Sequence, residues 1–331
     1  MEEGLALWAN PSSPHAEGRK ARNALEDART RMKAALGWEG EVIFTSGASE
    51  AAALAMGRAQ GGARLVGAAE HDAVLKAAPE AERLPVRPNG ALDMDAFAEA
   101  VVREKPVVAV QHINSETGNR MDIAAIAGLV HAQDGLMIVD CAQSAGKFAL
   151  PPQADMAIIS AHKFGGPIGV GALLVRDLAM LAPDGGQERG YRRGTENLPG
   201  VLGMAAALEA CSDGFVAADT LAPLEGFAAD VREAGGVWLD DMLADPTPYI
   251  ATIAMPKMSG SAQLMRFDMA GIAVSQGSAC SSGTMKGSHV LEAMALDSKV
   301  AEKAIRVSFG WNTTREEVER FCEVWLELVK Q

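Results

Sequence analysis

Apolar positions along the chain come in short, unbroken runs that alternate with longer amphipathic stretches. Runs such as Val107–Gln111, Leu136–Asp140 and Met156–Ser160 contain many β-branched residues and are bounded by polar segments. This pattern is typical of strands that are buried on both faces of a parallel sheet. The other strands that it predicts in this part of the chain are Glu41–Thr45, Arg64–Ala68 and Val170–Arg176.

The stretches between these runs are predicted to be helices. Ala16–Leu36 is long and heavily charged, and Glu316–Val329 carries an apolar stripe with charges on its other side. Strands that alternate with helices indicate an α/β fold with a mostly parallel central sheet and helices on both faces. The remaining predicted helices are Glu50–Arg58, Asp93–Glu104, Ile123–Gln133 and Pro199–Ser212.

The pattern changes character near residue 215. Beyond it the chain is acidic and helix-rich until two further predicted strands, Tyr249–Met255 and Gly271–Ser275. A chain of 331 residues is long enough for two domains. We expect a large α/β domain over residues 1–215 and a smaller α+β domain over residues 216–331.

Composition narrows the classes of function. Acidic side chains outnumber basic ones by 43 to 30, and the formal net charge of −13 disfavours a nucleic-acid partner, which normally meets a basic face. No apolar run reaches the roughly 18 residues that suggest a membrane span. The first residues lack the cationic and then apolar pattern of a signal peptide. We expect a cytoplasmic protein that binds neither nucleic acid nor membranes.

The chain has four cysteines, and none of them forms a CxxC pair, so we expect no metal site. Cys141, Cys211 and Cys322 lie in apolar or helical surroundings that suit small buried residues. Cys280 lies in the Gly- and Ser-rich stretch Ser275–Gly283, which is too small and polar to be core. Such a setting suits a reactive, accessible thiol, although an incidental loop cysteine would give the same pattern.

Two charged residues follow neighbouring predicted strands, where open parallel sheets bind ligands. Lys163 lies between the strand Met156–Ser160 and two glycines. A lysine in this position can form a Schiff base, and the glycines leave room for a flat cofactor. Asp140 ends another strand and could keep a pyridinium nitrogen protonated. The alternatives are a surface lysine and an aspartate that caps the next helix.

Four other features could contribute to such a site. The small-residue turn in Thr45–Glu50 leads into a helix whose first amides can attract phosphate, or it is only a capping turn. His71 could stack on a flat cofactor or be a structural histidine. The basic loop Gly185–Thr195 could meet an anion or only solvent. Arg306 interrupts an apolar run and needs a partner, for which a substrate carboxylate is suitable.

Together these segments resemble the cysteine desulfurases, within the class V aminotransferase branch of the fold-type I enzymes that depend on pyridoxal 5'-phosphate (PLP). The resemblance runs from Asn10 to Gly310, with the motifs in the order found in the family. It is similar to the subgroup that has a long loop around its active cysteine and serves iron–sulfur cluster assembly. The motifs are FTSGASE, EHDAVL, HINSETG, DCAQSAGK, SAHKFGGPIGVGAL, GGQERGYRRGTEN, SQGSACSSG, SHVLEAM and IRVSFG.

The resemblance implies a role in holding PLP for several residues. Lys163 would carry the cofactor covalently. His71 would stack on its ring and assist proton transfer. Asp140 would pair with the ring nitrogen and Gln143 with the ring hydroxyl. The residues implied to hold the phosphate are Ala48, Ser49, Ser160 and His162.

The resemblance also implies a reaction and its partners. Arg306 would bind the carboxylate of L-cysteine, with Asn114 and Ser115 beside it. Cys280 would take the sulfur as a persulfide, L-alanine would leave, and a sulfur-acceptor protein would receive the sulfur for iron–sulfur clusters or tRNA thiolation. Thr195 would reach the phosphate bound by a second subunit, so a homodimer is implied.

Two features depart from the family pattern. The family usually has a second asparagine, which contacts the cofactor and the substrate carboxylate, where this chain has Ser115. A strand and an Ala-Thr-Thr segment usually precede the match at Asn10, so we expect Met1 to be an internal methionine of a longer protein. Two alternative functions are a catalytically weak PLP-binding paralogue that acts as a scaffold or regulator, and a PLP lyase or aminotransferase for another amino acid such as selenocysteine.

Overall fold

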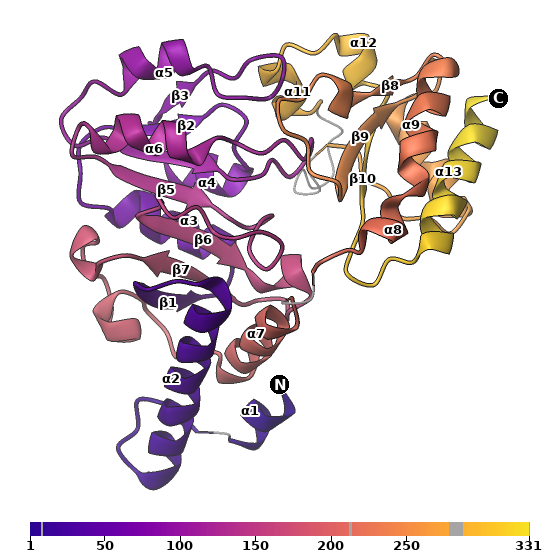
Figure 1. The fold of residues 1–331 in the computed structure, drawn as a ribbon. Helices are drawn as coiled ribbons and strands as arrows, with labels where there is room; N and C mark the ends of the chain where they lie inside the picture. Colours follow the sequence, from indigo (N-terminus) through magenta and orange to yellow (C-terminus); the bar gives the residue numbers. More distant parts are fainter. Residues whose placement is uncertain (8, 212–213, 278–286, 331) are drawn as a thin grey trace.

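The computed structural model describes residues 1–7, 9–211, 214–277 and 287–330. They form a seven-stranded sheet and, beside it, a three-stranded sheet (Figure 1). The large sheet has the strand order β1-β7-β6-β5-β4-β2-β3, and all strands run in the same direction except β7. The expected α/β fold with a mostly parallel sheet is confirmed.

Four strands of the large sheet coincide with their predicted ranges. They are β1 (Glu41–Thr45), β4 (Val107–Gln111), β5 (Leu136–Asp140) and β6 (Met156–Ser160). The pattern does not predict β3 because this short edge strand has two exposed residues and a single buried one. The other strands are β2 (Arg64–Gly67), β3 (Glu82–Leu84) and β7 (Gly171–Val175).

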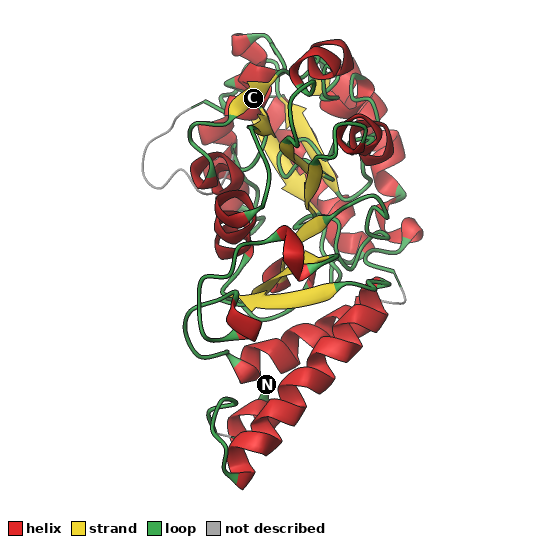
Figure 2. Ribbon diagram, turned by 90° about the vertical axis from the view of Figure 1, so that its left-hand side faces the viewer, coloured by secondary structure: helices red, strands yellow, loops and turns green. Residues whose placement is uncertain are grey.

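Helices cover both faces of the large sheet, because successive side chains of a strand point to opposite sides. On β5, Met137 and Val139 belong to one apolar cluster and Ile138 to the other. Figure 2 shows helices on both sides of the strands, and the two termini lie far apart along the molecule. The helices are α1 (Glu2–Ala6), α2 (Ala16–Leu36), α3 (Ala48–Arg58), α4 (Asp72–Ala77), α5 (Met94–Ala100), α6 (Ile123–His131) and α7 (Leu198–Ala210).

The small sheet is antiparallel and has its own core around Phe227, Phe267, Phe321 and Trp325. Its strands are β8 (Val237–Trp238), β9 (Ile250–Ala254) and β10 (Ala304–Ser308). The accompanying helices are α8 (Ala218–Leu221), α9 (Pro223–Glu233), α10 (Gly260–Met269), α11 (His289–Ala293), α12 (Ser298–Ala301) and α13 (Arg315–Val329). Within the described ranges, no helix is both long and apolar enough to cross a membrane.

The predicted strand Gly271–Ser275 is wrong. Gly271 has a φ of 76° and ends α10: its N–H donates to the Asp268 carbonyl, and the N–H of Ile272 donates to the Phe267 carbonyl. These two bonds are a helix-terminating motif that requires a left-handed residue, for which glycine is suited. Only Ser275 forms a β-bridge, with Arg306 of β10.

Candidate active site

The predicted site residues gather at the carboxyl edge of the large sheet. Asp140 ends β5 and lies opposite Gln111, the last residue of β4. Ser160 ends β6, which pairs with β5. His71 begins α4 soon after β2. Because these strands are parallel, their ends meet at the edge where α/β sheets bind ligands.

Lys163 lies in a single 3-10 turn, η1 (Ala161–Phe164), that follows β6 directly. The turn ends at Gly165, whose φ of 85° is in the left-handed region that favours glycine. A Cβ atom at Gly165 would also stand only 2.8 Å from Nε1 of Trp311. The glycine after Lys163 and Phe164 is therefore required both by the backbone and by the packing of Trp311.

Asp140, His71 and Lys163 are electrostatically coupled. The Asp140 carboxylate is buried, and its Oδ1 accepts a hydrogen bond from the Ala142 N–H at 2.9 Å. Burial raises the pKa of Asp140, whereas the Ala142 bond and the positive charges of His71 and Lys163 lower it. The three side chains thus belong to one site, in which a further cation would stabilise the buried carboxylate.

His71 has a fixed ring orientation because it caps α4. Its Nδ1 accepts a hydrogen bond from the Ala73 N–H at 3.1 Å. In the neutral imidazole the proton therefore lies on Nε2. The structural role that the sequence left open for His71 is thus present as a helix cap, and it also fixes the face that the half-buried ring presents.

Glu70, which precedes His71, was not recognised from the sequence. It is fully buried, and neither carboxyl oxygen has a hydrogen-bond partner among the described residues. Burial, together with the charge of Asp140, raises the pKa of Glu70 well above its usual range. Burial therefore disfavours the charged form of Glu70 beside the site, while the backbone N–H of Gln111 opposes this in part. The available signal was an acidic residue directly after an apolar run.

The turn before α3 has the geometry of a phosphate-binding site. Gly47 caps the helix with a φ of 150°, and a Cβ atom there would stand 3.8 Å from Ser160 Oγ. Ser160 Oγ and His162 Nδ1 are 3.0 Å apart. The first amides of a helix lack intrahelical acceptors and attract anions. The structure thus places Ala48 and Ser49, in the first turn of α3, beside this Ser160–His162 pair.

Gln143 lies in the turn that follows Asp140. Its side-chain Oε1 accepts a hydrogen bond from Lys147 Nζ at 3.4 Å. Its backbone carbonyl accepts one from the Tyr249 hydroxyl at 2.9 Å. The turn is therefore held both from within and by the segment that leads into β9.

Arg306 reaches the large sheet from β10 and contacts the turn 114–118. Its Nη1 donates to the Ser115 carbonyl at 2.9 Å. The Asn114 side chain shapes the same turn, because its Oδ1 accepts the N–H groups of Glu116 and Thr117 at 2.8 Å and its Nδ2 donates to a backbone carbonyl. Asn114 thus orients Ser115 towards Arg306, while its own polar atoms are engaged within the protein.

Cys280 lies outside the described residues, but its flanking segments are fastened to the site. On one side, Ser275 exchanges two backbone hydrogen bonds with Arg306. On the other, Ser288 Oγ donates to Glu116 at 2.5 Å, and His289 Nε2 lies 2.9 Å from the Glu70 carbonyl oxygen. Both flanks therefore join the protein next to predicted site residues.

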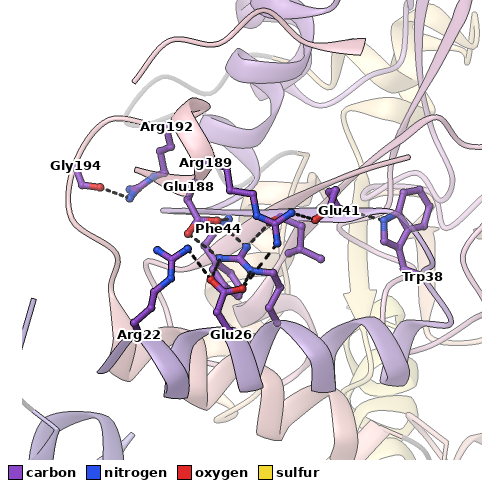
Figure 3. A network of polar contacts seen from close by, with 11 residues as sticks. Arg22, Glu26, Trp38, Glu41, Phe44, Glu188, Arg189, Arg192 and Gly194 are labelled. Atoms are coloured by element: carbon purple, nitrogen blue, oxygen red, sulfur yellow. Dashed lines mark hydrogen bonds and ion pairs between the residues drawn. The ribbon is translucent and has the colours of Figure 1, made fainter. Parts of the chain in front are cut away.

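The basic loop that carries Thr195 is anchored by a buried ion pair. Within it lies η3 (Glu188–Gly190), where Glu188 is buried and accepts from Arg29 Nη1 at 2.8 Å and from the Phe44 N–H at 2.8 Å. Figure 3 shows Glu188 beside Phe44, among the basic side chains of this network. Arg192 then pairs with Glu50, in the first turn of α3, at 2.9 Å.

Thr195 itself is exposed. It lines a cavity of about 600 Å³ between α1, the loop before α2 and the start of α7. The cavity lining includes Gly4, Asn10 and His15 but neither Lys163 nor Asp140.

The three described cysteines are structural. Cys141 is fully buried, and burial raises the pKa of its thiol. Burial also raises the pKa of Cys322 to about 12. Cys211 is half-buried, its Sγ lies 3.2 Å from the Ala207 carbonyl oxygen, and desolvation raises its pKa. None of the three has the accessible thiolate that nucleophilic chemistry needs.

Comparison with known proteins agrees with this geometry. The model of the aminotransferase class-V family matches residues 2–321. A protein of Cereibacter sphaeroides named cysteine desulfurase is 36% identical over 98% of this chain and 89% of its own length. The X-ray structure of a NifS-like protein from Rickettsia africae ESF-5 is 27% identical, with a TM-score of 0.88 over 100% of this chain and 95% of that one. A structure titled "SspA in complex with cysteine" is 27% identical, with a TM-score of 0.76 over 94% and 95% of the two chains.

The fold is that of a PLP-dependent enzyme. The chain belongs to the aminotransferase class-V family, among its cysteine desulfurases. The residues present suit the cofactor: a protonated ring nitrogen would place a cation beside the buried Asp140 carboxylate, and the start of α3 offers amides for the phosphate.

Proposed function

We propose that this protein takes the sulfur atom from L-cysteine and releases L-alanine, with Lys163 and Cys280 as its two reactive groups. The observation that carries the proposal is the coupling of Asp140, His71 and Lys163 at the sheet edge where both flanks of the Cys280 segment are fastened. The similar structure titled with cysteine supports the substrate class. Bound PLP supplies an electron sink for the electrons released at the substrate carbon.

The protein's own groups divide the work of holding the cofactor. Lys163 binds it covalently and afterwards is an amine that can move a proton. Asp140 holds the ring nitrogen in its protonated form. His71 presents a ring of fixed orientation with its proton on Nε2, and Gln143 donates to the ring hydroxyl. The proposed phosphate contacts are the turn residues Ala48, Ser49, Ser160 and His162.

The substrate is proposed to lie between the two sheets. Arg306 would bind its carboxylate, and Ser115 would lie beside it because its carbonyl already accepts from Arg306 Nη1. The Cys280 thiolate attacks the substrate sulfur, the bond between sulfur and the substrate β-carbon breaks, and its electron pair stays with that carbon. Protonation of the carbon gives alanine, and Cys280 keeps the sulfur as a persulfide.

The persulfide sulfur would then pass to an acceptor protein. An accessible thiol in a Gly- and Ser-rich segment supports transfer to a second protein, which the family resemblance assigns to iron–sulfur cluster assembly or tRNA thiolation. We also propose a homodimer in which Thr195 serves the phosphate of the second subunit. The exposure of Thr195, and its place in a cavity whose lining includes neither Lys163 nor Asp140, support this arrangement.

Two variants test the proposal. Lys163→Ala should lose the covalent cofactor, which borohydride reduction and peptide mapping detect in the wild-type protein at Lys163. Cys280→Ser should retain the cofactor and bind cysteine yet release alanine only at background level. Cys211→Ser serves as the matched control, because its thiol is hydrogen-bonded within the protein. Full alanine release by Cys280→Ser, or PLP attached at another lysine, would contradict the proposed roles.

A further inference from the structure

A second lysine lies close to the proposed cofactor site, and the family resemblance gives it no role. Lys147 follows Gly146, which has a left-handed φ of 73° and lies in the turn after Asp140. Its ammonium group lies 4.5 Å from the ring centre of Phe215 and 4.9 Å from that of Tyr249. A lysine enclosed by aromatic rings loses much of its hydration, which is costly for a charge.

The polar contact of Lys147 is with a proposed site residue. Its Nζ donates to Gln143 Oε1 at 3.4 Å, one helical turn away along the chain. Burial, together with the charge of Lys163, lowers the pKa of Lys147 to about 7. Lys147 is therefore near Lys163 as well as Gln143.

This contact decides how the Gln143 amide faces. A glutamine amide presents an acceptor at one end and a donor at the other. In its charged form Lys147 has donors only, so it binds the oxygen end of the amide, and the NH₂ end is left for the opposite direction. The ring oxygen of PLP is an acceptor and requires a donor. The Tyr249 hydroxyl, bound to the Gln143 carbonyl at 2.9 Å, fixes the backbone of the same residue.

We propose that Lys147 is a positioning residue for the cofactor: it holds the Gln143 amide with its NH₂ group towards the ring oxygen of PLP. This inference rests on the proposed cofactor site. Lys147 touches neither substrate nor PLP, and it acts through Gln143. It also places a second cation beside Lys163, which disfavours the protonated form of the nitrogen at that residue.

The test is a double-mutant cycle of Lys147→Met and Gln143→Leu, with PLP as the probe. Methionine keeps the length of the side chain and fits the aromatic surroundings. PLP affinity is measured by equilibrium dialysis of the holoprotein. Lys147→Met should weaken PLP binding about tenfold, the size of one lost hydrogen bond. In a protein that already carries Gln143→Leu, Lys147→Met should weaken PLP binding little further, because the two residues act as one unit.

Thermal stability separates positioning from a structural role. Lys147→Met removes a poorly hydrated charge, so its melting temperature should equal or exceed that of the wild type. The pH midpoint of the visible absorbance of bound PLP should rise, because a cation beside Lys163 is gone. Lys299→Met, at an exposed lysine of α12, is the control and should change neither quantity.

The outcomes are distinct. Unchanged PLP affinity and an unchanged absorbance midpoint in Lys147→Met would overturn the inference. The inference would also be overturned if Lys147→Met reduced PLP affinity equally in the wild-type and the Gln143→Leu protein, because Lys147 would then not act through Gln143. A wild-type protein that holds no PLP at Lys163 would contradict the proposed cofactor site itself, and the inference with it.

Discussion

At the scale of single residues, burial shifts the pKa of two side chains beside the proposed site, upward for Glu70 and downward for Lys147. Asp140 and Lys163 were predicted because each follows a strand at the edge where ligands bind. Glu70 was not, because its burial depends on neighbours that the sequence does not bring together. The same holds for Lys147, whose aromatic surroundings come from distant segments. The roles of the predicted site residues remain proposals.

Replacing Glu70 by glutamine should stabilise the protein increasingly as the pH rises. The ordinary pKa of this carboxyl is 4.5, and burial raises it well above that value in the folded protein. Above pH 4.5 the unfolded chain loses the proton while the folded protein keeps it, so wild-type stability falls by about 1.4 kcal/mol per pH unit from this group. The loss ends once the pH passes the folded pKa. Glu70→Gln lacks this dependence.

Urea unfolding of both proteins at pH 5, 6, 7 and 8 measures this difference. The advantage of Glu70→Gln should grow with pH from pH 5 upwards until the pH passes the folded pKa of Glu70, and should then stay constant. Glu82→Gln, at an exposed position of β3, is the control and should show no such trend. A difference that stays constant with pH would mean that Glu70 is already ionised in the folded protein.

At the scale of helices and strands, the apolar pattern predicted the sheet interior well and its borders less well. β1, β4, β5 and β6 were exact because nearly every residue of these strands is buried, so that each forms an unbroken apolar run. The direction of β7 was not predicted, because a strand buried on both faces looks the same whether it is parallel or antiparallel. The predicted strand Gly271–Ser275 was wrong because its glycine ends α10 instead of starting a strand.

Loss of Arg29 should destabilise the loop that carries Thr195. Arg29→Met leaves the buried Glu188 carboxylate without its cation, which costs about 3–5 kcal/mol in comparable buried pairs. The double variant with Glu188→Gln should recover part of this stability because no charge is then left unpaired. Chemical denaturation measures the stability of both variants. Limited proteolysis within residues 185–195 shows whether the loop becomes accessible to cleavage.

A matched control lies on the same helix. Arg22 pairs with Glu26 at 2.9 Å on the surface of α2. Arg22→Met should cost less than about 1 kcal/mol, because exposed ion pairs contribute little. Similar losses in the two variants would show that the burial of the Arg29–Glu188 pair has no energetic consequence.

At the scale of the whole molecule, the two sheets are connected around the proposed site. Arg120 of the large part binds Asp245 through two hydrogen bonds at 2.7 and 3.0 Å. Thr252 of β9 donates to the Glu116 carbonyl at 2.8 Å. The division into domains near residue 215 stays a prediction. The contacts between the two parts could not be predicted from the sequence, because they join residues that are more than a hundred positions apart.

A second subunit that completes the site can be tested by complementation. Lys163→Ala and Thr195→Asp should each inactivate the homodimer. In a mixed dimer, the Lys163 site of one subunit would receive an intact Thr195 from the other. Mixed dimers, which carry one chain of each kind, should therefore have one intact site in two, about half of the wild-type number.

The measurement is alanine release by protein co-purified through two different tags. If Thr195 acted within its own subunit, one site of each mixed dimer would lack Lys163 and the other would lack Thr195. Neither site would then be intact, and no activity would return. Cysteine turnover at background level in the mixed dimers would thus refute the intersubunit role of Thr195.

The burial of Cys141 and Cys322 and the hydrogen-bonded state of Cys211 have a practical consequence for chemical labelling. Alkylating reagents react with thiolates, and near neutral pH the raised pKa of each of these three thiols keeps its thiolate scarce. Native protein treated briefly with iodoacetamide should therefore gain one label, at Cys280. Mass spectrometry of that single adduct can follow the loading and discharge of sulfur without removing any other cysteine.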